Sequence, residues 1–123
     1  MMRIKLQSMT VDQLVERFVA IALEQDEAEL MGDTHKFSPL FWQMEAVEEE
    51  LKARPGDQRR VLLSLYDHSN AQVRVKAAKA ALALAPQAAR RTLQIVADSH
   101  CGSQSLEAGM SLVNLDRGIF KPH

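Results

Sequence analysis

Residues 62–86, LLSLYDHSNAQVRVKAAKAALALAP, carry the pattern that decides the fold. They predict a short helix, a tight turn at 67–70 and a second helix rich in alanine. The alanines let a neighbouring helix approach closely, while bulkier side chains fill the space around them. The small residues are Ala77, Ala78, Ala80 and Ala81, and the bulky ones are Val73, Leu82 and Leu84. The segment is therefore a packing unit, and no catalytic motif occurs in it.

This hairpin resembles the repeats of HEAT and armadillo proteins, which pair two antiparallel helices. The matching residues are an aspartate in the turn, a Val-Arg step and an alanine-rich run: Asp67, Val73, Arg74, Ala77, Ala78, Ala80 and Leu82. The resemblance implies that Asp67 and Arg74 form a structural ladder between neighbouring turns. Their separation is one residue longer here than in the usual repeat.

As a whole, the chain is similar to a family of short bacterial helical proteins with no assigned function. The likeness runs from Met9 to Pro122 and is carried by the phrases LVERFVAIALEQDEA, MEAVEEELKARPGDQRR and GIFKP. The family implies an all-helical fold, and it implies no activity.

The chain has 123 residues, enough for one domain with a real core, and an ordinary globular composition. Its single cysteine, Cys101, allows no disulfide within the chain, which is typical of the cytoplasm. The first residues lack the apolar region of a secretory signal, and no run approaches the ~18 apolar residues of a membrane-spanning helix. We therefore expect a cytoplasmic protein with no membrane contact.

The net charge is only −1, but the charges are unevenly distributed. Residues 1–57 hold six Lys and Arg against twelve Asp and Glu, a balance of −6. Residues 58–123 hold nine against four, a balance of +5. Either each half simply solvates its outer faces, or opposite ends attract, which would give head-to-tail association or docking of a partner. The second interpretation allows a homo-oligomer.

Apolar periodicity and helix-end signals predict six helices. Thr10 and Gln13 form a capping box for the first helix, and Gly32 ends it. Asp33 or Thr34 could cap the second helix, but Pro39 favours a start near Ser38, with residues 33–37 as a turn. The helix is expected to end at 54–56. Its apolar residues are expected on one face: Phe37, Leu40, Phe41, Met44, Val47 and Leu51.

The third helix is expected to be short, with Asp57 as its cap. Its inward residues are Val61, Leu62 and Leu65, and its outward residues are Arg59 and Arg60. The fourth helix ends at 85–86, and Pro86 begins the fifth, whose inward residues are Ala89, Leu93 and Val96. A break at 100–103 precedes a last helix over 105–117, which places Leu106, Met110 and Val113 together. Gly118 closes it in a Schellman-type turn, and Phe120 is expected to pin the tail.

These helices make three antiparallel pairs, over 10–53, 57–85 and 86–117. Three stacked pairs bury a continuous core, so we expect an all-α protein, a right-handed α–α superhelix of HEAT or armadillo type. A globular helical bundle is the alternative. The expected organisation is an N-terminal tail over 1–9, a single helical-repeat domain over 10–120 and a C-terminal tail over 121–123.

No residue pattern predicts a catalytic, cofactor-binding or metal site. The adjacent His100 and Cys101 hint at a nucleophile, but neighbouring side chains rarely point at each other productively. The four histidines lack metal-ligand spacing: His35, His68, His100 and His123. The acidic residues of the second helix, Glu45, Glu48 and Glu49, lack the Glu-x-x-His partners of a di-metal site.

Basic residues on successive helices are the nearest approach to a nucleic-acid surface: Arg59, Arg60, Arg74, Lys76, Lys79, Arg90 and Arg91. Nucleic-acid binding is not expected, because such surfaces carry more positive charge and stacking aromatics. Phe41 and Trp42 fit helix packing better than a ligand platform. We therefore expect a non-enzymatic protein-interaction module whose partner is another protein. The alternatives are an immunity- or antitoxin-type binder, an enzyme subunit and a weak nucleic-acid binder.

Overall fold

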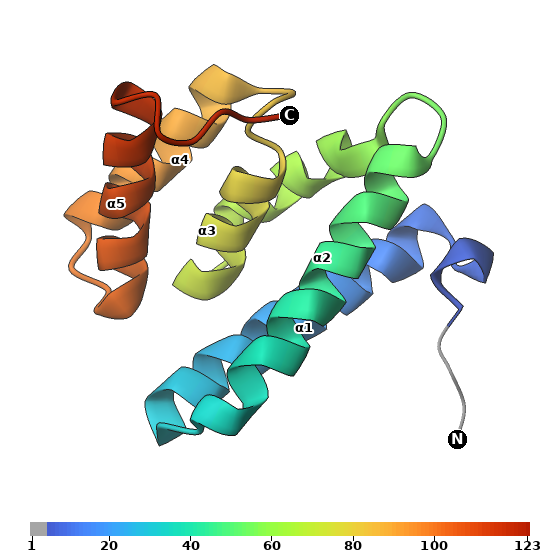
Figure 1. Ribbon diagram of the computed structural model, residues 1–123, viewed down its shortest axis with the longest axis horizontal. Helices are drawn as coiled ribbons and strands as arrows, with labels where there is room; N and C mark the ends of the chain where they lie inside the picture. The colour runs from blue at the N-terminus through green and yellow to red at the C-terminus, as the bar shows by residue number, and fades with distance from the viewer. Residues whose placement is uncertain (1–4) are drawn as a thin grey trace. The chain divides into compact units, whose positions relative to one another are not determined.

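The computed structural model describes residues 5–123, and this part of the chain contains helices, turns and loops but no strand (Figure 1). The all-α prediction is confirmed for these residues. The chain forms two compact units, of which the first ends at Val61 and the second begins at Leu62. The domain limits expected from the sequence stay a prediction, and residues 1–4 of the expected tail lie outside the described residues.

The first unit is built on two long helices, α1 (Val11–Met31) and α2 (Phe37–Ala53), which pack side by side as an antiparallel hairpin (Figure 1). The predicted capping box is confirmed: the Gln13 N–H donates to Thr10 Oγ1 at 3.1 Å, and the Thr10 N–H donates to Gln13 Oε1 at 2.9 Å. Gly32 ends α1 in the left-handed conformation, with φ of 66°. The short 3₁₀ turn η2 (Thr34–Lys36) leads into α2.

The buried face of α2 is narrower than the sequence predicted. Four of the six expected residues are buried, namely Leu40, Met44, Val47 and Leu51, whereas Phe37 and Phe41 are exposed. Helical rotation brings the four buried residues into line and turns Phe41 toward the flank of the helix. The helix begins at Phe37, within one residue of the predicted start near Ser38, and Pro39 is tolerated in its first turn, where no intrahelical N–H bond is needed.

Arg54, just after α2, holds the start of the described chain in place. Residues Leu6–Ser8 form the 3₁₀ turn η1. The Arg54 Nη2 group donates to the carbonyl oxygens of Leu6 and Met9 at 3.1 and 2.8 Å, while its Nε donates to Glu50 at 2.7 Å. A charged fork with three oxygen acceptors fixes the segment before α1 onto the end of the hairpin.

Replacing Arg54 by lysine should release this segment, because a single ammonium cannot reproduce the fork geometry. We expect a loss of about 1–3 kcal/mol in unfolding free energy and faster amide exchange of residues 5–9. Urea denaturation and hydrogen exchange measure the two effects. Arg60→Lys, at an exposed arginine, is the matched control and should change neither; an unaltered exchange rate in Arg54→Lys would contradict the anchoring role.

The segment Gln58–Asp67 winds as a 3₁₀ helix, η3. With three residues per turn, Arg59, Leu62 and Leu65 share one face, and all three are buried. The expectation that Arg59 points outward is therefore wrong, because it assumed α-helical rotation. The Asp57 carboxylate accepts from Arg59 Nε and Nη2 at 2.9 and 2.7 Å. These hydrogen bonds lower the pKa of Asp57 and raise the pKa of Arg59, which keeps the pair ionised.

The second unit contains α3 (Ala71–Ala80), α4 (Pro86–Asp98) and α5 (Ser103–Asp116). Each of these helices packs against the other two (Figure 1). Their shared core consists of Val75, Ala78, Leu82, Ala89, Leu93, Val96 and Ala108. The predicted start of a helix at Pro86 is confirmed, whereas α3 ends at Ala80 and not at 85, because residues 81–84 form turns.

The finer expectation of a HEAT-type superhelix is not confirmed. Within the second unit three helices pack mutually, and the ladder implied for Asp67 and Arg74 is missing. Asp67 is exposed, no ion pair joins it to Arg74 among the described residues, and Arg74 Nε is buried without a hydrogen-bond partner there. The extra residue between Asp67 and Arg74 accounts for this, since it shifts the arginine along its helix relative to the turn.

The last helix ends as predicted but faces differently. The Ile119 N–H donates to Asn114 O at 2.9 Å and the Gly118 N–H to Leu115 O at 3.2 Å, which is the Schellman pattern. Phe120 stays exposed and does not pin the tail. The grouped residues of α5 are exposed as well: Leu106, Met110 and Val113.

A charge cluster joins α3 to α5. Lys76 Nζ and Lys79 Nζ lie 2.7 and 3.1 Å from Glu107 Oε2. Burial by itself would raise the pKa of Glu107, but the two ammonium groups together lower that pKa below its ordinary value. The folded state therefore favours the ionised carboxylate.

Because its pKa is lowered in the folded state, Glu107 stabilises the fold above the ordinary value of 4.5, and this stabilisation disappears as the pH falls through the lower, folded-state pKa. We expect Glu107→Gln to cost about 1–3 kcal/mol at pH 7. Urea denaturation across pH 7 to 3 should show the variant and the wild type converging at acidic pH. Asp116→Asn breaks an exposed ion pair with Arg90 and should cost less than about 1 kcal/mol; a pH-independent difference for Glu107→Gln would refute the assignment.

Candidate interaction surface on helix α2

The first two turns of α2 present exposed aromatic side chains. Trp42 is 65% exposed, Phe41 52% and Phe37 37%. The chain has one Trp, one Tyr and four Phe, so half of its aromatic residues gather at this end of one helix. We call Phe37, Phe41 and Trp42 the aromatic surface. Exposed apolar groups in a contiguous patch are typical of a binding site, whereas isolated ones are not.

The two most exposed rings are held against each other. The ring centroids of Phe41 and Trp42 are 5.0 Å apart, and the ring planes meet at 83°, an edge-to-face contact. Each side chain therefore restricts the rotamers of the other. A partner that covers the pair has less side-chain entropy to remove than it would at two independent rings.

Carboxylates continue the same side of the helix. Glu45 and Glu49 follow Trp42 at i+3 and i+7, which places all three on one face of α2. Glu49 is exposed and Glu45 half-buried. Their neighbour Glu48 lies seven residues beyond Phe41. The outward side of α2 therefore passes from aromatic at its start to acidic toward its end.

From the sequence, Phe41 and Trp42 were predicted to pack between helices. That prediction is wrong for these two side chains, because both are exposed. The exposure of Trp42 could have been inferred from the sequence, because Trp42 lies about 200° around the helix from Leu40 and therefore opposite the buried face. Phe41 lies only about 100° from Leu40, so its exposure was harder to infer from rotation alone.

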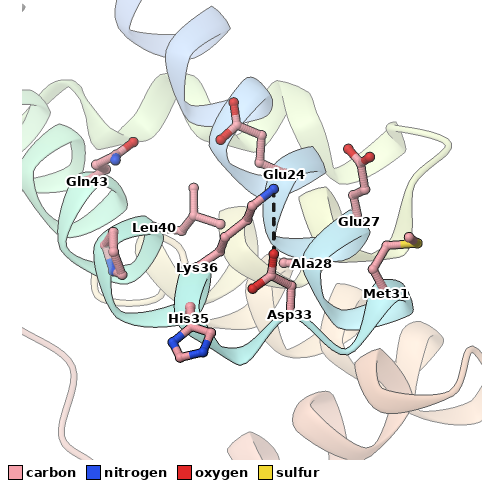
Figure 2. A pocket seen from close by; sticks show the side chains of 10 residues that line it. Glu24, Glu27, Ala28, Met31, Asp33, His35, Lys36, Leu40 and Gln43 are labelled. Atoms are coloured by element: carbon pink, nitrogen blue, oxygen red, sulfur yellow. Dashed lines mark ion pairs between the residues drawn. The ribbon is translucent and has the colours of Figure 1, made fainter.

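A surface pocket of about 650 Å³ lies at the turn between α1 and α2 (Figure 2). Glu24 and Glu27 line it from α1, and Lys36 from η2 forms a 3.8 Å ion pair with Asp33. The remaining lining residues are Ala28, Met31, His35, Pro39, Leu40 and Gln43. Charges of both signs line this open pocket, and Trp42 is not part of it.

The structure does not assemble a nucleophile from His100 and Cys101. Cys101 Sγ lies 3.0 Å from Ser99 Oγ, and its backbone N–H donates to Ser105 Oγ at 2.6 Å. His100 is exposed, with φ of 57°. The thiol therefore contacts a hydroxyl in its own loop and not the imidazole next to it.

The other titratable residues singled out in the sequence stay dispersed. Within residues 5–123, no three His, Cys, Asp or Glu side chains come together in a way that could hold a metal ion. His68 Nδ1 accepts from the Asn70 N–H at 3.0 Å and so supports the turn before α3. None of the helices in the described chain has both the length and the hydropathy needed to cross a membrane.

More than half of the candidate basic residues are paired with carboxylates within the chain, although Lys76 and Lys79 share one of them, Glu107. Four of the seven basic residues form ion pairs: Arg59, Lys76, Lys79 and Arg90. Arg60 and Arg91 are exposed. Cations already paired with carboxylates have less to offer a phosphate backbone, which needs several simultaneous contacts for useful affinity.

A solved structure resembles this chain closely. The protein RPA1889 from the bacterium Rhodopseudomonas palustris CGA009 is 45% identical in sequence, with a TM-score of 0.94. The match covers 98% of this chain and 100% of that one. None of the curated proteins matches the sequence.

The predicted likeness to a bacterial, all-helical family without assigned function is confirmed, while its HEAT-like repeats are not. Residues 12–116 match the family described as a domain of unknown function, DUF2019. That match spans most of the 123 residues. The chain belongs to the DUF2019 family.

Proposed function

We propose that the protein is a non-catalytic module that binds another protein through the aromatic surface of α2. The observation that carries the proposal is the exposed, mutually packed pair of Phe41 and Trp42. Aromatic residues, and Trp above all, are enriched at the centres of protein interfaces.

The energetics favour binding as the role of this pair. Burying one such side chain contributes about 1.5–3 kcal/mol of favourable free energy, which is absent while the rings face water. A few anchors of this kind carry most of the affinity of a typical interface. An immunity- or antitoxin-type protein would be one form of such a binder, and the single cysteine supports a cytoplasmic setting.

The aromatic surface should contribute little to folding. We expect Trp42→Ala to lower the unfolding free energy by about 1 kcal/mol or less, through loss of the edge-to-face contact alone. Phe18→Ala, at a fully buried residue of α1, should cost about 3–5 kcal/mol. Urea denaturation of both variants makes the comparison. Equal losses would mean that Trp42 serves the fold and not a partner.

Affinity capture from a native lysate tests the binding role. The baits are the wild type, Phe41→Ala/Trp42→Ala, and the control Leu106→Ala/Met110→Ala, which removes two side chains of similar exposure from α5. We expect a protein that the wild type and the control retain equally and the aromatic variant retains at least about tenfold less, since two anchors are lost. Recovery of no protein by the wild type, or equal retention by all three baits, would defeat the proposal.

A further inference from the structure

We infer that α2 binds a cationic segment of the partner protein. Lys or Arg side chains of this segment pair with Glu45 and Glu49, and apolar side chains of the same segment cover Phe41 and Trp42. The inference rests on the proposed function and adds the chemistry of the partner. It follows from the carboxylates that share a helix face with the exposed indole.

The part of the chain that carries the aromatic surface has a negative net charge, although Arg17 donates to Gln43 next to Trp42 and Lys36 precedes Phe37. Residues 1–57 carry a balance of −6. Three acidic residues there, Asp33, Glu50 and Asp57, are engaged in ion pairs within the first unit. Glu45 and Glu49 form no ion pair within 4 Å among the described residues, although the charge of Glu49 helps to raise the pKa of Arg59. Both carboxylates can therefore pair with charges on a partner.

The geometry allows one cation to interact with the indole of Trp42 and the carboxylate of Glu45 at the same time. Trp is the strongest aromatic acceptor of a cation–π contact, and Glu45 lies one turn further along the same face. An Arg or Lys placed over the indole is therefore also close to a carboxylate. A basic residue one turn further along a docked helix would reach Glu49 in the same way.

Other classes of macromolecule fit this surface poorly. Nucleic acid and anionic lipid would be repelled by the carboxylates. A neutral apolar surface would cover the rings but would desolvate Glu45 and Glu49 without compensation. The complementary surface is thus basic and apolar together, as on an amphipathic helix rich in Lys and Leu.

Three synthetic helical peptides test the inference directly. They are about 15 residues long, share one pattern of leucines, contain no aromatic residue and carry Lys, Gln or Glu at the polar positions. Trp42 is the single Trp of the chain, so its fluorescence reports binding at this surface alone. At about 0.15 M salt we expect only the Lys peptide to shift the emission to shorter wavelength, with an affinity that falls as salt is raised.

Matched charge variants locate the attraction. Glu45→Gln/Glu49→Gln should weaken binding of the Lys peptide about three- to tenfold, the effect of losing two exposed ion pairs. Glu16→Gln/Glu29→Gln makes the same change in net charge at two exposed residues of α1 and should weaken binding less than about twofold.

Several outcomes would overturn the cationic partner. These are equal binding of the Gln peptide, binding of the Glu peptide, binding of none of the three, and equal loss in both pairs of charge variants. An emission shift that depends on the protein's own concentration would instead assign the surface to a second copy. If lysate capture succeeds while the peptides show no charge preference, the inference fails and the proposed function stands; if capture also fails, both fall.

Discussion

The second unit depends on close approach between helices that present alanine to one another. Ala78, Ala89 and Ala108 come from α3, α4 and α5 respectively, and each is fully buried in the shared core. Larger side chains at these positions would separate the helices, because interaxial distance follows the residues at the contact. The ion pairs of Glu107, next to Ala108, with Lys76 and Lys79 on α3 also require this short separation.

In the first unit, α2 divides its circumference between folding and recognition. Its inward stripe, Leu40, Met44, Val47 and Leu51, packs at nearly complete burial, whereas Trp42 on the opposite side contacts Phe41 and solvent. A helix that must satisfy only a narrow inward stripe is free to vary on its other faces. The exposed rings contribute little to the hairpin, and this is why we assign them to a partner.

Only some of the unevenly distributed charges form ion pairs within the chain. After residue 57, Lys76 and Lys79 pair with Glu107 and Arg90 pairs with Asp116, but these acidic residues are already counted in the balance of +5. Glu45 and Glu49 on α2 have no such pairing among the described residues. The acidic face of α2 is therefore available to a cationic partner.

The sequence by itself determined the helical class and most helix ends: the Thr10 capping box, the Gly32 stop, the Pro86 start and the Schellman turn at Gly118. Each of these is decided within about one turn of backbone, so local residue chemistry suffices. Only the tertiary structure decided the 3₁₀ winding that buries Arg59. It also decided that Phe41 and Trp42 are exposed, although the sequence pattern had predicted that both pack between helices. It likewise decided that α5 buries Gln104 and Ala108 and leaves Leu106 in solvent. Which face of a helix is buried depends on the space that its neighbours leave. Where the helices approach closely, a small residue fits into that space and a larger apolar residue does not.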